Sequence, residues 1–151
     1  MLLDLILAIG HHILVFGIAA ILAAELVLIR PGINAAQLRQ AGKIDLFYGI
    51  AAGLVVLVGF ARVYFGVKAP DFYLQNPVFW AKIGTFAVVG LLSVPPTLLL
   101  LKWRGAAKAD ATFLPMAAEV AAVRRYLKIE AHLFILIPIF AAAMARGYGL
   151  R

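Results

Sequence analysis

The sequence predicts an all-α protein, a transmembrane antiparallel four-helix bundle formed by a single domain over residues 1–151. Two observations support this fold class. First, 65% of the residues are hydrophobic and only 14% are charged, whereas soluble domains are about half apolar and about a quarter charged. Second, four apolar runs are each close to the roughly 20 residues that a helix needs to cross a ~30 Å hydrocarbon core. Because lipid offers backbone groups no hydrogen-bond partners, these runs are expected to be helices.

The four spans are expected at residues 2–29, 46–67, 78–101 and 129–146. The strongly polar residues inside them are few: Asp4, His11, His12, Glu25, Arg62, Lys82, Glu130 and His132. The helices of a soluble bundle would each need a polar stripe, which these runs lack. The first run has no basic segment before it and is too long for a signal peptide, so we expect it to be a retained span.

Proline, glycine and asparagine residues mark the expected helix ends. Pro31-Gly32 ends the first helix, and Asn34 is expected to cap a helix that runs into the second span. Asn76-Pro77 starts the third helix, which Pro95-Pro96 is expected to bend near its inner end. Thr112 is expected to start a helix that continues into the fourth span.

The basic residues predict which side of the membrane each link faces. They gather in two of the three links: Arg30, Arg39 and Lys43 in the first, and Lys102, Arg104, Lys108, Arg124, Arg125 and Lys128 in the third. The second link holds only Lys68 against Asp71. By the positive-inside rule, both basic links are cytoplasmic and both termini face outward, in what we expect to be a bacterial inner membrane.

The net charge of +7 does not indicate a nucleic-acid partner, because the basic residues cluster between apolar runs rather than along one soluble face. The expected partner is the lipid bilayer. The chain contains no cysteine, which excludes disulfides and thiolate metal sites.

Four polar side chains are expected to converge in the outer half of the bundle. A charged side chain costs roughly 2.5–3.5 kcal/mol at the centre of a membrane helix, so its presence needs a reason. Arg62 and Lys82 lie about five residues, or roughly 7–8 Å, inside the outer boundary, and His11 and His12 lie roughly 14–15 Å deep. An alternative is that the cations snorkel to the interface and the histidines bond across helices.

A haem b would use this arrangement. A neutral histidine nitrogen is a common axial ligand of haem iron, and cationic side chains can pair with the haem propionates. Helix bundles commonly hold such cofactors between facing helices. The expected metal ligand is therefore His12 or His11, and Arg62 and Lys82 are expected to bind the cofactor.

The second axial ligand is left open. His132 is the only other histidine, but it is expected roughly 7–9 Å deeper than His12 along the membrane normal. His11 and His12 cannot both bind one iron axially, because adjacent helix positions diverge by about 100°. Lys82 is an unusual alternative ligand.

A second polar group is expected near the inner side: Glu25, Asp45, Tyr48, Glu130 and His132. Its acids could carry protons or pair with basic side chains. Ion pairs with Arg30, Arg125 or Lys128 are the favoured interpretation.

Three short motifs carry a resemblance to known families: His11-His12-Ile13-Leu14 in the first span, Phe79-Trp80-Ala81-Lys82 in the third, and the entry from Arg125 to Glu130 in the fourth. The chain resembles small four-span bacterial membrane proteins and, more distantly, the HemJ-type protoporphyrinogen oxidases. The resemblance implies haem b, with His12 or His11 as iron ligand. It also implies Lys82 as a catalytic residue that binds a propionate, the substrate or the iron.

The leading hypothesis is a haem-b-binding membrane protein, either an oxidoreductase or an electron carrier, with a porphyrin, a quinone or a protein as redox partner. Porphyrinogen oxidation follows only from the HemJ resemblance. The alternative is a non-enzymatic accessory or assembly subunit of a larger membrane complex. A transporter is the third hypothesis, and it would need a homo-oligomer because four spans enclose little space.

Overall fold

The structure, a computed structural model, describes residues 1–149. The described chain is all-α, with the elements α1 (Leu2–Leu28), α2 (Ala35–Phe65), α3 (Pro70–Leu74), α4 (Pro77–Ala109) and α5 (Ala117–Ala145). The four long helices are apolar and long enough to cross a membrane. The predicted fold class is therefore confirmed, while the short helix α3 was not predicted from the sequence.

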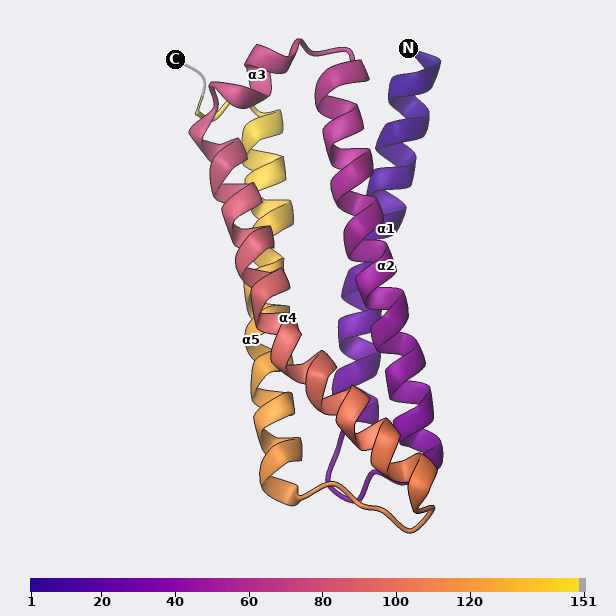
Figure 1. Cartoon of the computed structure of the whole chain (residues 1–151). Coiled ribbons are helices and arrows are strands. Elements are labelled where there is room, and N and C mark those ends of the chain that lie inside the picture. Colours follow the sequence, from indigo (N-terminus) through magenta and orange to yellow (C-terminus); the bar gives the residue numbers. More distant parts are fainter. Residues whose placement is uncertain (150–151) are drawn as a thin grey trace.

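The long helices form two antiparallel pairs. α1 packs mainly against α2, and α4 packs mainly against α5, with smaller contacts from α2 to α4 and from α1 to α5. Figure 1 shows that the two pairs lie apart at the end that carries both termini and α3. We call this end the terminal end. The opposite end, which carries the two links rich in Arg and Lys, is the basic end.

Asparagine caps explain where two of the helices begin. The side chain of Asn34 accepts a hydrogen bond from the Gln37 N–H over 2.9 Å, and the Gln37 side chain accepts one from the Asn34 N–H over 3.0 Å. This reciprocal pair is a capping box, which satisfies two backbone donors at the start of α2. Asn76 similarly accepts from the Val78 N–H over 2.8 Å, and Pro77 occupies the first position of α4. Both starts agree with the sequence.

Pro95 and Pro96 lie inside α4, which continues beyond them to Ala109. A proline inside a helix removes one backbone hydrogen bond and its ring clashes with the preceding turn, so the helix bends. Figure 1 shows α4 changing direction in its second half and crossing from α5 toward α1 and α2. The predicted bend is confirmed.

The expected helix start at Thr112 is wrong, because α5 begins at Ala117. Thr112 instead closes a turn with Asp110: its N–H and its hydroxyl donate to Oδ1 of Asp110 over 2.8 and 2.6 Å. These two hydrogen bonds stabilise the carboxylate and hold the pKa of Asp110 below its usual range. A short polar side chain can form such a local turn without starting a helix.

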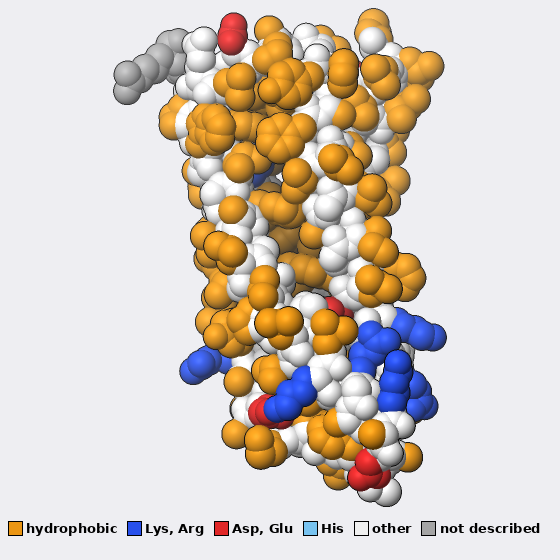
Figure 2. Space-filling view, viewed as in Figure 1, with side chains coloured by type: hydrophobic (Ala, Val, Ile, Leu, Met, Phe, Trp, Pro, Cys, Tyr) orange, Lys and Arg blue, Asp and Glu red, His pale blue; other side chains and the backbone are white. Residues whose placement is uncertain are grey.

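Most of the closely packed interior lies toward the basic end. Fully buried side chains there include Leu38, Leu100, Trp103, Val123 and Leu127. Large apolar side chains are exposed on all four long helices. Figure 2 shows them covering the upper part of the visible face, while Lys and Arg gather near the basic end. An apolar surface of this extent faces lipid, so the chain is an integral membrane protein.

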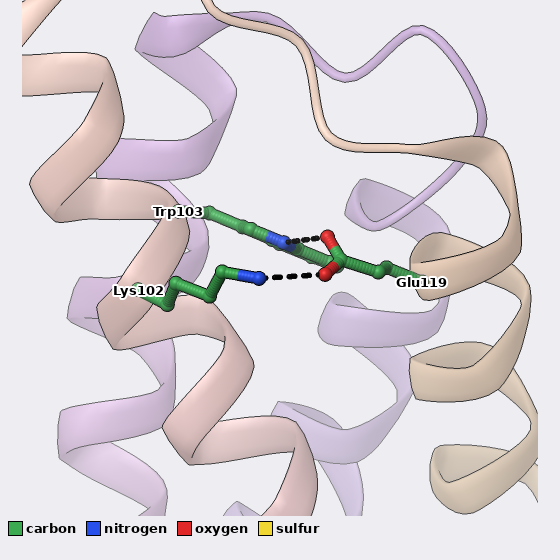
Figure 3. A network of polar contacts seen from close by, with 3 residues as sticks. All are labelled: Lys102, Trp103 and Glu119. Carbon is green, nitrogen blue, oxygen red and sulfur yellow. Dashed lines mark hydrogen bonds and ion pairs between the residues drawn. The ribbon is translucent and has the colours of Figure 1, made fainter.

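Glu119 of α5 makes polar contacts with two residues of α4 near the basic end (Figure 3). Its Oε1 lies 2.8 Å from Nζ of Lys102, and its Oε2 accepts a hydrogen bond from Nε1 of Trp103 over 2.8 Å. The indole of Trp103 is fully buried, so Glu119 supplies the acceptor that its N–H could not obtain from water.

Candidate functional site

The divergence of the two helix pairs leaves a cavity in the terminal half of the bundle. The cavity consists of two pockets of about 340 Å³ each. The pockets adjoin, because both are lined by His11, Gly59, Val63, Phe79 and Lys82. Figure 2 shows the hollow between the helix pairs, with a basic side chain visible inside its upper part.

The pocket nearer the terminal end is cationic. It is lined by Arg62 of α2, Lys68 of the link to α3, and Lys82 of α4, and none of the side chains that line it is acidic. Nε of Arg62 is buried without a hydrogen-bond partner. The ammonium of Lys68 lies 3.7 Å from the ring centre of Phe72, and that of Lys82 lies 5.1 Å from the ring centre of Phe79. Three cations without a lining carboxylate favour an anionic ligand group.

The second pocket is apolar. Apart from His11 and Lys82, its lining is hydrophobic or glycine: Val15, Ile18, Val55, Val56, Gly59, Phe60, Val63, Phe79, Ile83, Phe86, Ala87, Phe134 and Ile137. All four long helices contribute to it. The whole cavity therefore suits an amphipathic molecule, with an anionic group among the cations and an apolar body deeper in the bundle.

His11 lies where the two pockets meet. Its Nδ1 is buried and has no hydrogen-bond partner. A Cβ atom built on Gly59 of α2 would lie 3.3 Å from Cε1 of His11, so the lack of a side chain at Gly59 makes room for the imidazole.

His12 is more exposed than His11 and lines only the cationic pocket. Its Nδ1 lies 2.7 Å from the carbonyl oxygen of Ala8. Because a carbonyl only accepts hydrogen bonds, this contact requires a proton on Nδ1 and leaves Nε2 free. The two rings stand edge to face, with 6.3 Å between their centres, so the adjacent histidines point in different directions.

The structure brings His11, His12, Arg62 and Lys82 together around one cavity, and it places His132 elsewhere. His132 is exposed, lines neither pocket, and has its Nδ1 2.6 Å from the carbonyl oxygen of Lys128. We therefore do not assign His132 to the site. Among residues 1–149, no three His, Cys, Asp or Glu side chains are grouped so that they could hold a bare metal ion.

The expected ion pairs of the inner acids are absent. Within the described residues, the single ion pair closer than 4 Å joins Lys102 to Glu119. Glu25 and Glu130 therefore have no basic partner, and Asp45 accepts a hydrogen bond from the Thr97 hydroxyl over 2.7 Å instead. The prediction that Arg30, Arg125 or Lys128 neutralises these acids was wrong, because all three cations are exposed and the acids lie inside the bundle.

A family described as "Predicted membrane protein (DUF2214)" matches residues 3–149. The chain belongs to this family. No curated protein and no solved structure matches the chain. The resemblance to small membrane proteins thus has support, whereas the resemblance to HemJ-type oxidases has none and stays a prediction.

Three residues of the cavity were missed by the sequence analysis. Lys68 was counted only as a charge in a link, and Phe72 and Tyr73 were not assigned to a site. All three line the cationic pocket, because α3 folds over the terminal end of the cavity. Pro70 at the first position of α3 was the available signal for this short helix.

Proposed function

We propose that this protein binds haem b in the cavity of its terminal half and acts as a membrane oxidoreductase or electron carrier. The bilayer is the bacterial inner membrane, and both termini face outward. The observation that carries the proposal is the half-buried imidazole of His11, whose Nδ1 is buried without a hydrogen-bond partner and which lines both an apolar pocket and a pocket with three cations and no acid.

The side chains of the cavity fit the parts of a haem. The macrocycle is apolar and would occupy the pocket between Val55 and Phe134, while the propionates would pair with Arg62, Lys68 and Lys82. Haem iron comes with its porphyrin nitrogens and needs few protein ligands, so one histidine at the right place suffices. Bound haem would supply one-electron redox chemistry.

We assign the iron ligand to His11 rather than His12. His11 lines both pockets, so its imidazole reaches the apolar space where the centre of the macrocycle would lie. Gly59 supports this assignment by leaving room for the ring. Lys82 also borders both pockets, whereas Arg62 and Lys68 line only the cationic one, so Lys82 is the cation that we expect to contact a substrate beside the cofactor.

The test is the absorption spectrum of detergent-purified protein produced in haem-sufficient cells and then titrated with haemin. The wild type is expected to show a Soret band, His11→Ala to lose it, and His12→Ala to keep it. His132→Ala is the matched control, because it removes an exposed imidazole outside the cavity. A wild-type protein that stays colourless and does not bind added haemin would refute the proposal.

The same experiment separates haem from other amphipathic anions. A copurifying anionic lipid, detected by mass spectrometry in a protein that does not bind haemin, would assign the cavity to lipid instead. The redox function is tested separately, by whether the bound haem is reduced by a quinol and reoxidised by a quinone.

A further inference from the structure

A second set of buried polar side chains lies between the helices, on the basic-end side of the cavity. It consists of Glu25 of α1, Tyr48 of α2 and Glu130 of α5. Glu25 is 2% exposed, Glu130 is 0% exposed and Tyr48 is 6% exposed. These groups are therefore shielded from both water and lipid.

The two glutamates lack partners for their charge. The Tyr48 hydroxyl donates a long hydrogen bond to Oε2 of Glu130, over 3.4 Å. Oε1 of Glu25 and Oε1 of Glu130 are buried without any hydrogen-bond partner. Glu25 lies on α1 and Glu130 on α5, and these two helices pack against each other.

The charged groups on the neighbouring helices do not neutralise this pair. α2 contributes another acid, Asp45, whose carboxylate is bonded to Thr97 of α4. Arg104 of α4 donates to the Gly42 carbonyl over 3.4 Å. Arg124 of α5 donates to the carbonyls of Leu26, over 2.7 Å, and of Ile29. Both nearby arginines thus bind backbone oxygens near the basic end and form no ion pair with a buried glutamate.

An ionised carboxylate that is buried without a partner is so unfavourable that such a group normally takes up a proton instead. A second acid buried between the same helices makes ionisation of both less favourable, because like charges repel. We propose that Glu25 and Glu130 form a buried proton-binding site, which holds at least one proton at neutral pH with Tyr48 as its hydrogen-bond donor.

The site is separate from the proposed haem cavity. None of Glu25, Tyr48 and Glu130 lines either pocket, and the almost fully buried Leu22, Val55 and Phe134 belong to the apolar core, with Val55 and Phe134 forming part of the cavity wall. Ile18 lines the cavity, and Glu25 follows it on α1 by seven residues, or about 10 Å of helix.

Infrared spectroscopy of the purified protein tests this proposal. The measurement uses a detergent without ester groups, so that no lipid-like carbonyl band overlaps the carboxylic acid region. At neutral pH, the wild type is expected to show a protonated carboxyl C=O band that moves to lower frequency in D₂O. The double variant E25Q/E130Q is expected to lose this band.

Glu119→Gln is the matched control. Glu119 lies on the same helix as Glu130 but is paired with Lys102, so its loss is expected to remove carboxylate intensity and to leave the protonated band unchanged. Tyr48→Phe removes only the hydroxyl, and it is expected to shift the band to higher frequency. This variant keeps the proposal testable if the double variant fails to fold.

Three outcomes would overturn the proposal. The first is the absence of a protonated carboxyl band in the wild type. The second is a protonated carboxyl band that remains in a folded E25Q/E130Q protein. The third is a wild-type band that disappears when Na⁺ or K⁺ is added. The last outcome would mean that the glutamates hold a metal cation rather than a proton. All of these readouts are independent of haem, so failure of the haem proposal leaves them unaffected.

Discussion

Gly59 of α2 lies against the imidazole of His11 in α1, with 3.3 Å between the position of a Cβ on Gly59 and Cε1 of His11. A contact this short requires the neighbouring atom to move when a side chain is introduced. Helix packing with small residues lets helices approach closely, and here the small residue also leaves space for a ring. The position of His11 in the cavity therefore depends on the absence of a side chain at residue 59.

Gly59→Leu is expected to displace His11 and to remove most of the Soret absorbance of the haem-loaded protein. The physical reason is steric, since the new side chain and the imidazole would compete for the same space. Gly53→Leu is the control, because Gly53 lies on the same helix and a Cβ there meets nothing within 4 Å. Equal loss of haem in both variants would show that bulk on α2, rather than contact with His11, is responsible.

Arg62→Ala and Lys82→Ala are each expected to weaken haem binding about tenfold. A hydrogen bond to a charged group contributes about 1.5–3 kcal/mol, and about 1.4 kcal/mol corresponds to a factor of ten in Kd. The measurement is a haemin titration of the haem-free protein. Lys43→Ala is the control, since Lys43 is exposed and does not line the cavity.

Haem dimethyl ester sharpens this test, because its carboxyl groups carry no charge. The wild type is expected to bind haem more tightly than the ester, and both alanine variants are expected to lose part of this preference. If the variants weaken the binding of haem and of its ester equally, then the two cations support the shape of the cavity and do not pair with propionates.

The sequence was sufficient to predict the four helices and the convergence of polar side chains, because apolar length and residue depth depend on local sequence alone. It also located the bend at Pro95 and Pro96, since a proline acts on its own helix. The sequence could not predict that the two helix pairs diverge at the terminal end. That divergence depends on contacts between helices, and it opens the cavity that His11 lines and that His132 does not.

For a related reason, the sequence could not predict whether basic side chains pair with the buried acids. In the sequence Arg124 is one of several basic residues of the third link, whereas in the structure its guanidinium donates to the carbonyls of Leu26 and Ile29 at the end of α1. Carbonyl oxygens at the end of a helix lack partners inside that helix, and here the guanidinium bonds to them. Which acceptor a cation reaches is decided by three-dimensional proximity, which charge spacing along one chain does not reveal.

Glu119→Ala is expected to lower the Tm by a few degrees, and Glu119→Gln is expected to lower it less. The alanine leaves the buried indole N–H of Trp103 without an acceptor, whereas the amide oxygen of glutamine can still accept that bond. Lys102→Ala is expected to have the smallest effect, because the Lys102 side chain is 65% exposed and exposed ion pairs stabilise little. Thermal unfolding followed by circular dichroism gives the order of the three Tm values. A larger fall in Tm for Lys102→Ala than for Glu119→Ala would contradict the expected order.

The absence of cysteine makes the topology directly testable. Single cysteines at Lys68, Lys43 and Lys108 would each be exposed, the first near the terminal end and the other two near the basic end. A membrane-impermeant maleimide is expected to label Lys68→Cys in intact spheroplasts and to label the other two only after permeabilisation. The reason is that the positive-inside rule predicts a cytoplasmic location for the basic links. The reverse pattern would place both termini inside. Labelling of Lys43→Cys and Lys108→Cys from opposite sides would contradict the four-span topology, because an even number of spans separates these two positions.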